Sequence, residues 1–543
     1  MAFRGADRKE GGEKSRRPGR SLAVFKAIVL LALAAVAAYG MLNDGIYLDN
    51  LWLPVADGVL VLLLVTVFVR GYYQDVPPGG WVIAAFLAAL VGVKGLSIVW
   101  TISKTETINE VVRSSMYLAV FLVALGALTS TRQVGPLMDI SLLIITALAG
   151  YGLLEMINPV QYPTASFDGV RIDSTLGYAN STAAVLGMGV TLTLARTTAM
   201  RNALIRGLYA ALALTFVVAL YFTLSRGGIG ALLVGLILLF ILVEHRLQML
   251  ANLLLVSVPA AWLLWRVQSL EGFMSVGASD RQRIADGAVF SKYLIVALVA
   301  AFVLQAGYTF LIGRYELVPR GRRMLGALVL AGVVFAAGAG AFVVVGHYGG
   351  VGKTYETLVT NPSQTKNVGQ RLASLSLGNR LEYWPVAWRE WKQHPFTGSG
   401  AGTFQFIWLE NRPDDKGAKQ VHNLYLEQGT ETGVFAFLAL VGFVVTLVGY
   451  SVRATWRSHG DERRVLLAGL VSTLVVYLVS SSIEWHWYIP GSTLIFFLLA
   501  GVTAKFACRE DWDTAEAEVR PGGPEAGSGR VPDRGSHEER DTT

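Results

Sequence analysis

A polar stretch between residues 380 and 433 gathers most of the side chains that could carry out a reaction. His422 and Asn423 lie just before an apolar segment, and Glu427 and Glu431 are spaced to share one face of a helix. A neutral imidazole is well suited to take a proton from a hydroxyl group near pH 7. We therefore predict that His422 is a general base; the usual alternative is a solvated loop histidine. His394 and His486 compete for the same role.

Two arginines have the chemistry to bind phosphate. Arg226 lies at the end of an apolar segment and is followed by two glycines, and Arg380 opens the run Arg-Leu-Glu-Tyr-Trp. A guanidinium presents a planar fork of donors that matches phosphate oxygens. The alternative for Arg226 is a side chain that reaches to the membrane interface, and for Arg380 it is an ion pair with Glu382 or Glu390.

Further polar residues are possible substrate contacts. Arg171 precedes a helix that opens with Tyr178, and Asn180 in its first turn could hydrogen-bond a sugar, although capping the helix is commoner. Asn423 and Glu431 complete this set. Asp414 and Asp415 have no further ligand at suitable spacing, and Gly398–Gly402 lacks the lysine of a phosphate-binding loop, so we predict chemistry that needs neither metal nor cofactor.

The elements that must position these residues are membrane-spanning helices. The chain has 543 residues, of which 53% are hydrophobic and 16% charged, whereas soluble domains carry about 25% charge. Continuous apolar segments predict about fourteen spans and an all-α polytopic membrane protein, and they exclude a soluble enzyme and disfavour a β-barrel. The predicted spans are 22–42, 51–69, 81–102, 114–130, 137–157, 178–195, 207–224, 228–243, 249–265, 290–313, 324–346, 430–450, 465–481 and 489–507.

Five regions follow from this pattern. They are a basic cytoplasmic tail (1–21), eleven spans (22–346), a large extracytoplasmic catalytic loop (347–429), three further spans (430–507) and a disordered cytoplasmic tail (508–543). Within the loop, Trp384, Trp388 and Trp391 recur at helical spacing, which predicts a short amphipathic helix anchored in the interface. Pro385 predicts that this helix starts or kinks near the proline.

Lys and Arg are concentrated in alternate gaps between the spans, which places both termini in the cytoplasm and the candidate residues on the outer side of the cytoplasmic membrane. This rule also explains the net charge of +7 without nucleic-acid binding. Nucleotide sugars and ATP are not available on the outer side. An enzyme there needs a donor activated within the lipid, such as a polyprenyl diphosphate.

Four sequence motifs together resemble the O-antigen ligase and O-antigen polymerase superfamily of bacterial membrane glycosyltransferases. They are Leu176–Ala184, Leu224–Gly228, the run from Arg380 through Trp384, Trp388 and Pro395 to Gly400, and Val421–Gly433, which includes His422-Asn423. The chain departs from the family in having more predicted spans, long polar tails, and Glu484 and His486 in the last outer turn.

The resemblance implies a GT-C-like membrane fold and a metal-independent transfer of a glycan from undecaprenyl diphosphate to an acceptor hydroxyl. It implies that His422 activates the acceptor and that Arg226 and Arg380 hold the diphosphate. The partners would be the lipid-linked donor, membrane lipids, and an acceptor lipid, glycan or protein. Ligase and polymerase activities remain open, and the alternative from another class is a transporter or flippase of lipid-linked sugars.

Overall fold

The computed structural model describes residues 19–163, 171–275, 277–312 and 378–509 apart from 414 and 459, together with scattered positions between 321 and 354. The predicted span 324–346, the first part of the predicted loop and nearly all of both predicted tails therefore lie outside the described residues. Every other predicted span coincides with a described helix. The count of fourteen spans stays a prediction.

Each long or short regular element that the structure describes is a helix. The long helices are α1 (Arg20–Met41), α2 (Asp49–Phe68), α3 (Pro78–Leu96), α4 (Lys104–Ala127), α5 (Val134–Ile157), α6 (Ala179–Ala199), α7 (Ala203–Phe222), α8 (Arg226–Leu242), α9 (Arg246–Val267), α11 (Asp280–Ile312), α17 (Leu424–Arg457), α18 (Asp461–Ser480) and α19 (Pro490–Cys508). The short elements are η1 (Asp44–Ile46), η2 (Ser97–Val99), η3 (Thr131–Gln133), η4 (Ser174–Leu176), α10 (Glu271–Met274), α15 (Arg380–Gln393), α16 (Phe404–Asn411) and η5 (His486–Tyr488).

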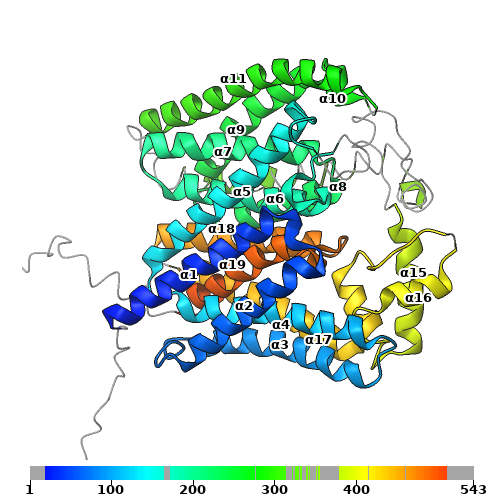
Figure 1. The fold of residues 1–543 in the computed structure, drawn as a ribbon. Helices are drawn as coiled ribbons and strands as arrows, with labels where there is room; N and C mark the ends of the chain where they lie inside the picture. The colour runs from blue at the N-terminus through cyan, green and yellow to red at the C-terminus, as the bar shows by residue number, and fades with distance from the viewer. Residues whose placement is uncertain are drawn as a thin grey trace, which may run out of the picture.

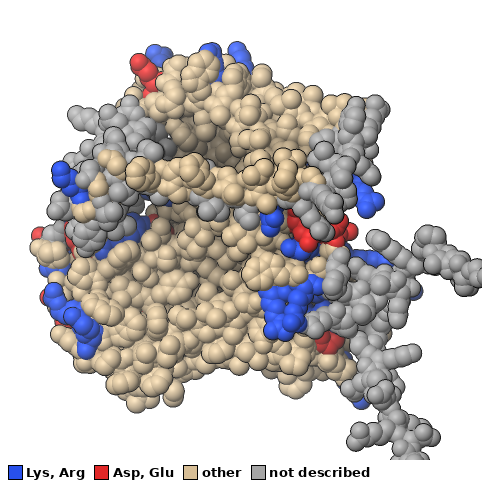
Figure 2. Space-filling view, turned by 180° about the vertical axis from the view of Figure 1, so that it is seen from behind, with Lys and Arg blue, Asp and Glu red and all other residues tan. Residues whose placement is uncertain are grey.

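Eleven of the described helices are long and apolar enough to cross a membrane. They also leave large apolar side chains on the outside of the bundle, such as Leu64, Phe68 and Val99. Figure 2 shows a broad band of uncharged surface on the lower part of the molecule, with charged groups gathered on either side of it. This arrangement confirms the prediction of an all-α, multi-pass membrane protein.

The helices α18 and α19 form the centre of the bundle. Their apolar windows are 83% and 94% buried, against 22% for α2. Helix α18 packs mainly on α6 and α8, and α19 packs on α4 and α1 (Figure 1). Helix α6 is also buried almost throughout, and its Thr191 hydrogen-bonds Thr473 of α18 at 2.8 Å. Because α6 faces other helices rather than lipid, it can carry such polar side chains.

Several connecting segments meet at one end of the bundle, where α15 and α16 project from it (Figure 1). Backbone hydrogen bonds join Ile102 to Ser399 at 3.2 Å and Leu424 to Ser481 at 2.9 Å, and the Thr175 hydroxyl donates to the carbonyl of Met41 at 2.8 Å. Residues far apart in the chain are therefore brought together at this end.

The amphipathic helix predicted around the tryptophans is α15. It begins at Arg380 and runs through Pro385, so the predicted start at the proline is wrong. Trp388 is half exposed, in keeping with an interfacial position. Trp391 instead packs on α17, where a Cβ added to Gly429 would lie 2.4 Å from its ring. Trp391 therefore holds α15 on the bundle as well as contributing to its apolar face.

Candidate functional site

His422 is held in a defined backbone conformation just before α17. Its φ is +59°, which is uncommon for a residue other than glycine. The buried Val421 precedes it, and the Asn423 side chain caps α17 by accepting from the backbone N–H groups of Tyr425 and Leu426 at 3.1 and 3.0 Å. The Asn423 oxygen is thus engaged as a helix cap. The cap and the buried valine fix His422 between them.

The hydrogen bond of His422 identifies its tautomer. Nδ1 lies 3.0 Å from the carbonyl oxygen of Gln420. A carbonyl can only accept, so Nδ1 carries the proton and Nε2 carries the lone pair. The rings of Tyr383 and Trp485 lie 5.3 and 6.0 Å from the imidazole. His422 therefore presents a nitrogen able to accept a proton, between two aromatic side chains.

Electrostatics keep His422 neutral. Burial lowers the pKa of His422 below its ordinary value of 6.5; the Glu484 carboxylate opposes this shift, and the Arg380 guanidinium adds to it. An imidazole with a pKa below 6.5 is unprotonated at pH 7, as a general base must be.

The two competing histidines are less suited to that role. Both ring nitrogens of the buried His486 are taken by hydroxyls, Ser181 at 2.8 Å and Ser480 at 2.7 Å. Burial lowers the pKa of His486 to about 4. His394 lies at the end of α15 with a side chain that is 56% exposed, 3.9 Å from Glu390. Of the three, His422 has the free basic nitrogen and the enclosed setting.

Arg380 reaches the turn between α18 and α19. It forms an ion pair with Glu484, and its Nε donates to the carbonyl of Ile483. Burial alone would raise the pKa of Glu484, but the Arg380 guanidinium holds it below its usual range. Of the two partners predicted for Arg380, Glu382 lies instead 3.4 Å from Lys416. The carboxylate that pairs with Arg380 comes from more than one hundred residues further along the chain.

A chain of hydrogen bonds continues from Glu484 to Arg171. The Tyr178 hydroxyl donates to Glu484 at 2.7 Å, and the Asn180 amide donates to Tyr178 at 2.9 Å. Arg171 then donates to Asn180 at 2.5 Å and to the backbone carbonyl of Thr223 at 2.8 Å. Arg171 and Asn180 thus belong to the same network as Arg380.

Arg226 begins α8 beside this network. The Ser225 side chain caps the helix by accepting from the Gly228 N–H at 3.2 Å. A Cβ added to Gly227 would lie 2.5 Å from Cδ1 of Ile483, so a glycine is needed for this approach. Ile483 also accepts from Arg380, and Arg171 binds the backbone at Thr223. The backbone next to Arg226 therefore approaches the turn that binds Arg380, and Arg171 binds the chain just before α8.

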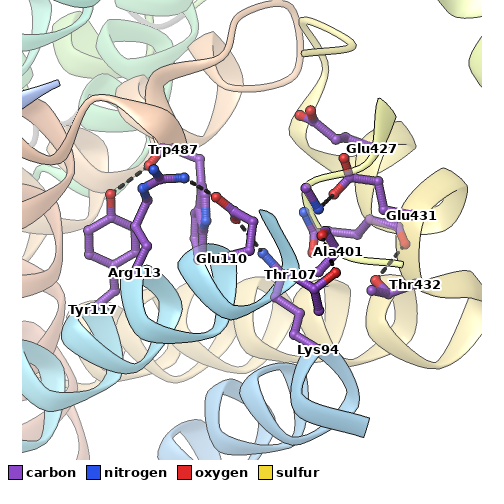
Figure 3. A network of polar contacts seen from close by, with 12 residues as sticks. Lys94, Thr107, Glu110, Arg113, Tyr117, Ala401, Glu427, Glu431, Thr432 and Trp487 are labelled. Atoms are coloured by element: carbon purple, nitrogen blue, oxygen red, sulfur yellow. Dashed lines mark hydrogen bonds and ion pairs between the residues drawn. The ribbon is translucent and has the colours of Figure 1, made fainter. Parts of the chain in front are cut away.

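Glu431 binds the backbone at the start of α16, away from the three arginines. Its carboxylate accepts from the backbone N–H groups of Gly402 at 2.7 Å and Phe404 at 3.1 Å, at the start of α16. Glu427, one helical turn earlier, accepts from the Val421 N–H at 3.3 Å. Both carboxylates point from α17 toward the loop (Figure 3). They hold the loop that carries His422, and the structure does not place them with the arginines.

Glu484, Tyr178 and Trp485 were not assigned a role from the sequence. Trp485 packs on Tyr178 at 4.6 Å and on His422 at 6.0 Å, and so joins the histidine to the network. The available signal was a carboxylate in a short turn between two apolar segments, where a charge is costly without a partner. Among the described residues, no group of three or more His, Cys, Asp or Glu side chains is arranged to hold a metal.

A comparison with protein families identifies one segment of the chain. Residues 288–441 match the model of the O-antigen ligase family, Wzy_C. This segment is similar to an O-antigen ligase domain. The match confirms the resemblance seen in the sequence motifs. The O-antigen ligase match includes Arg380, His422 and Glu431 and ends before Glu484, and it does not cover Arg226. A search of curated proteins finds no match to the chain.

Proposed function

We propose that the protein is a membrane glycosyltransferase of the O-antigen ligase type. It would transfer a glycan from undecaprenyl diphosphate to an acceptor hydroxyl. The observation that carries the proposal is that the His422 ring, the Arg380 side chain and the backbone next to Arg226 all border the 481–489 turn, from three separate parts of the chain. The family match supports a membrane protein that processes glycans.

The arginines supply what the leaving group requires. When the bond between C1 of the donor sugar and the diphosphate breaks, undecaprenyl diphosphate departs with the electron pair and gains negative charge. Guanidinium groups fixed in a partly water-excluded site stabilise that charge. Arg380 is already oriented by Glu484, and Arg226 is presented at the start of α8. In this proposal the pair forms the diphosphate clamp.

His422 acts on the acceptor. Its Nε2 takes the proton of the acceptor hydroxyl as the new bond from that oxygen to C1 forms. The Gln420 carbonyl holds the proton on Nδ1 and so keeps the required tautomer. No other described histidine offers the same combination of an enclosed ring and an available nitrogen. Metal independence and the absence of a cofactor remain predictions of this mechanism.

The distribution of positive charge in the sequence supports a site on the outer side of the membrane. With both termini in the cytoplasm, the end of the bundle that carries α15 and α16 faces outward from the cytoplasmic membrane. The donor is then supplied from the lipid, and its diphosphate lies at the depth of the helix ends where Arg226 and Arg380 are found.

The test is transfer in proteoliposomes with an undecaprenyl-diphosphate oligosaccharide and a panel of acceptors. The panel comprises a second lipid-linked oligosaccharide, a lipopolysaccharide core, a peptidoglycan disaccharide and a peptide. We expect release of undecaprenyl diphosphate that requires His422 and persists in EDTA. The mass of the product separates a ligase from a polymerase. Intact donor with every acceptor, together with movement of donor across the bilayer, would establish the transporter instead.

A further inference from the structure

A cavity lies beside the loop that carries His422. Its volume is about 420 Å³, within the range of roughly 300–1,000 Å³ found for small-molecule sites. Its lining comes from the start of α2, from the amino-terminal half of α4, from Gly402, Gln405, Lys419 and Gln420, and from Tyr488 of η5. Side chains that line it include Asn50, Glu110, Arg113, Gln405, Gln420 and Tyr488.

The cavity is connected to the proposed base by two contacts. Gln420 lines the cavity, and its carbonyl accepts the Nδ1 proton of His422 at 3.0 Å. Tyr47 also lines it and packs on Trp485 at 5.5 Å, which in turn packs on His422. None of the cavity's lining residues belongs to the network of Arg171, Arg226 and Arg380. The base is thus bordered by the arginine network through Glu484 and Trp485, and by the cavity through Gln420 and Tyr47.

The charges on the cavity wall do not favour another anion. Asp49, Glu106 and Glu110 are set against Arg113 and Lys419, which leaves more carboxylates than cations. Arg113 is ion-paired with Glu110, and Lys94 lies 3.3 Å from the same carboxylate (Figure 3). A diphosphate would find little uncompensated positive charge here.

The remaining chemistry of the wall suits a hydroxyl-rich, neutral ligand. Asn50, Gln405 and Gln420 each carry an amide that can donate and accept at once. Tyr47 and Tyr488 supply aromatic surface. In addition, one buried polar atom on this wall, Nε of Arg113, makes no hydrogen bond within the described residues. Such partners are typical of a site for sugar rings.

We propose that this cavity is a saccharide subsite that holds the hydroxyl-bearing sugar of the acceptor. The assignment rests on the proposed transferase function. In this proposal the donor's diphosphate binds at the arginine network, so the second substrate must approach His422 from elsewhere. The cavity borders the histidine through Gln420, which is not part of that network. The acceptor in this assignment is a glycan rather than a protein.

Two variants test the cavity in the full-length protein. Asn50→Trp places a bulky ring on an exposed first turn of α2 at the cavity. Tyr488→Phe keeps the ring and removes the buried hydroxyl together with its interaction with Glu427. Asn43→Trp is the matched control, because Asn43 is exposed in the preceding segment and does not line the cavity. Transfer is measured in proteoliposomes with the acceptor panel above, and binding of undecaprenyl diphosphate is measured separately.

We expect Asn50→Trp to raise the acceptor KM by about tenfold or more, and Tyr488→Phe by roughly fivefold. Undecaprenyl diphosphate binding and the behaviour of Asn43→Trp should match the wild type. A normal acceptor KM in both cavity variants would overturn the assignment, as would a rise in donor KM alone, which would mark a donor-glycan subsite. Transfer by the wild type only to the peptide would also overturn it. Wild-type protein that releases no undecaprenyl diphosphate would instead refute the underlying transferase function.

Discussion

Arg380 in the first turn of α15 is ion-paired with Glu484 in the turn between α18 and α19. The Tyr178 hydroxyl also donates to Glu484 at 2.7 Å. The Glu484 carboxylate therefore joins three elements: the residue before α6, the helix α15, and the turn between α18 and α19. A buried carboxylate with these partners orients the guanidinium before any donor binds. Glu484 is therefore a positioning residue for Arg380.

Replacement of His422 should stop the proton transfer while leaving the donor site intact. We expect His422→Ala to lower kcat by roughly 10²- to 10⁴-fold, the usual contribution of a general base. Release of undecaprenyl diphosphate from a lipid-linked oligosaccharide measures it, with binding of undecaprenyl diphosphate as the check on folding. His394→Ala is the matched control, since His394 is exposed on the same loop. Near-normal turnover in His422→Ala would remove this residue from the mechanism.

Replacement of Arg226 by lysine keeps the charge but loses the planar fork of donors. Because a hydrogen bond to a charged group is worth about 1.5–3 kcal/mol, we expect the Kd of undecaprenyl diphosphate to rise roughly 10- to 100-fold in Arg226→Lys. Binding can be followed by competition with a labelled lipid diphosphate. Arg389→Lys serves as control, because Arg389 is exposed on α15. An unchanged Kd in Arg226→Lys would contradict the assignment of Arg226 to the diphosphate clamp.

The pH dependence of kcat should report His422. The group is active when neutral, so activity is lost as pH falls through its pKa, which burial places below 6.5. At saturating donor, the acid limb of kcat should therefore have its midpoint below pH 6.5. Glu484 opposes the lowering of this pKa, so Glu484→Gln should move the acid limb to lower pH. An acid limb above pH 7, or one that moves upward in Glu484→Gln, would contradict the assignment.

Glu431 is expected to act through the loop rather than on substrate. In Glu431→Ala the N–H groups of Gly402 and Phe404 lose their acceptor, which costs about 1–3 kcal/mol for each buried group left unsatisfied. The Tm in detergent should fall, and kcat should fall with it. Glu431→Gln, which keeps one acceptor oxygen, should recover part of both, and Glu410→Ala on the exposed face of α16 should be neutral. A normal Tm with a raised substrate KM would restore the role of substrate contact.

Hydropathy and charge were sufficient to predict the membrane helices. The length and hydrophobicity of a segment are enough to show that it can span a bilayer. The turn at Ser225 between α7 and α8 was also predictable, since Arg226 and two glycines interrupt an apolar run. The helix over Arg380–Gln393 was predicted from its tryptophan spacing, but not its start, because a proline early in a helix need not end it.

The partners within the site could not be read from sequence. The choice of Glu484 over Glu382 or Glu390 for Arg380 depends on how α15 packs against α17 and reaches the 481–489 turn, a contact between distant segments. The tautomer of His422 depends on the position of the Gln420 carbonyl. Likewise, Asn423 and Glu431 bind backbone N–H groups, and their types alone do not separate this from binding a sugar.

The 481–489 turn has a consequence for biosynthesis. Arg380, Tyr178 and the backbone of Leu424 all take partners from this turn, which joins α18 and α19. During synthesis these two helices leave the ribosome after the loop that carries His422. In a nascent chain Arg380 and Tyr178 therefore lack their shared carboxylate until the hairpin of α18 and α19 has been made.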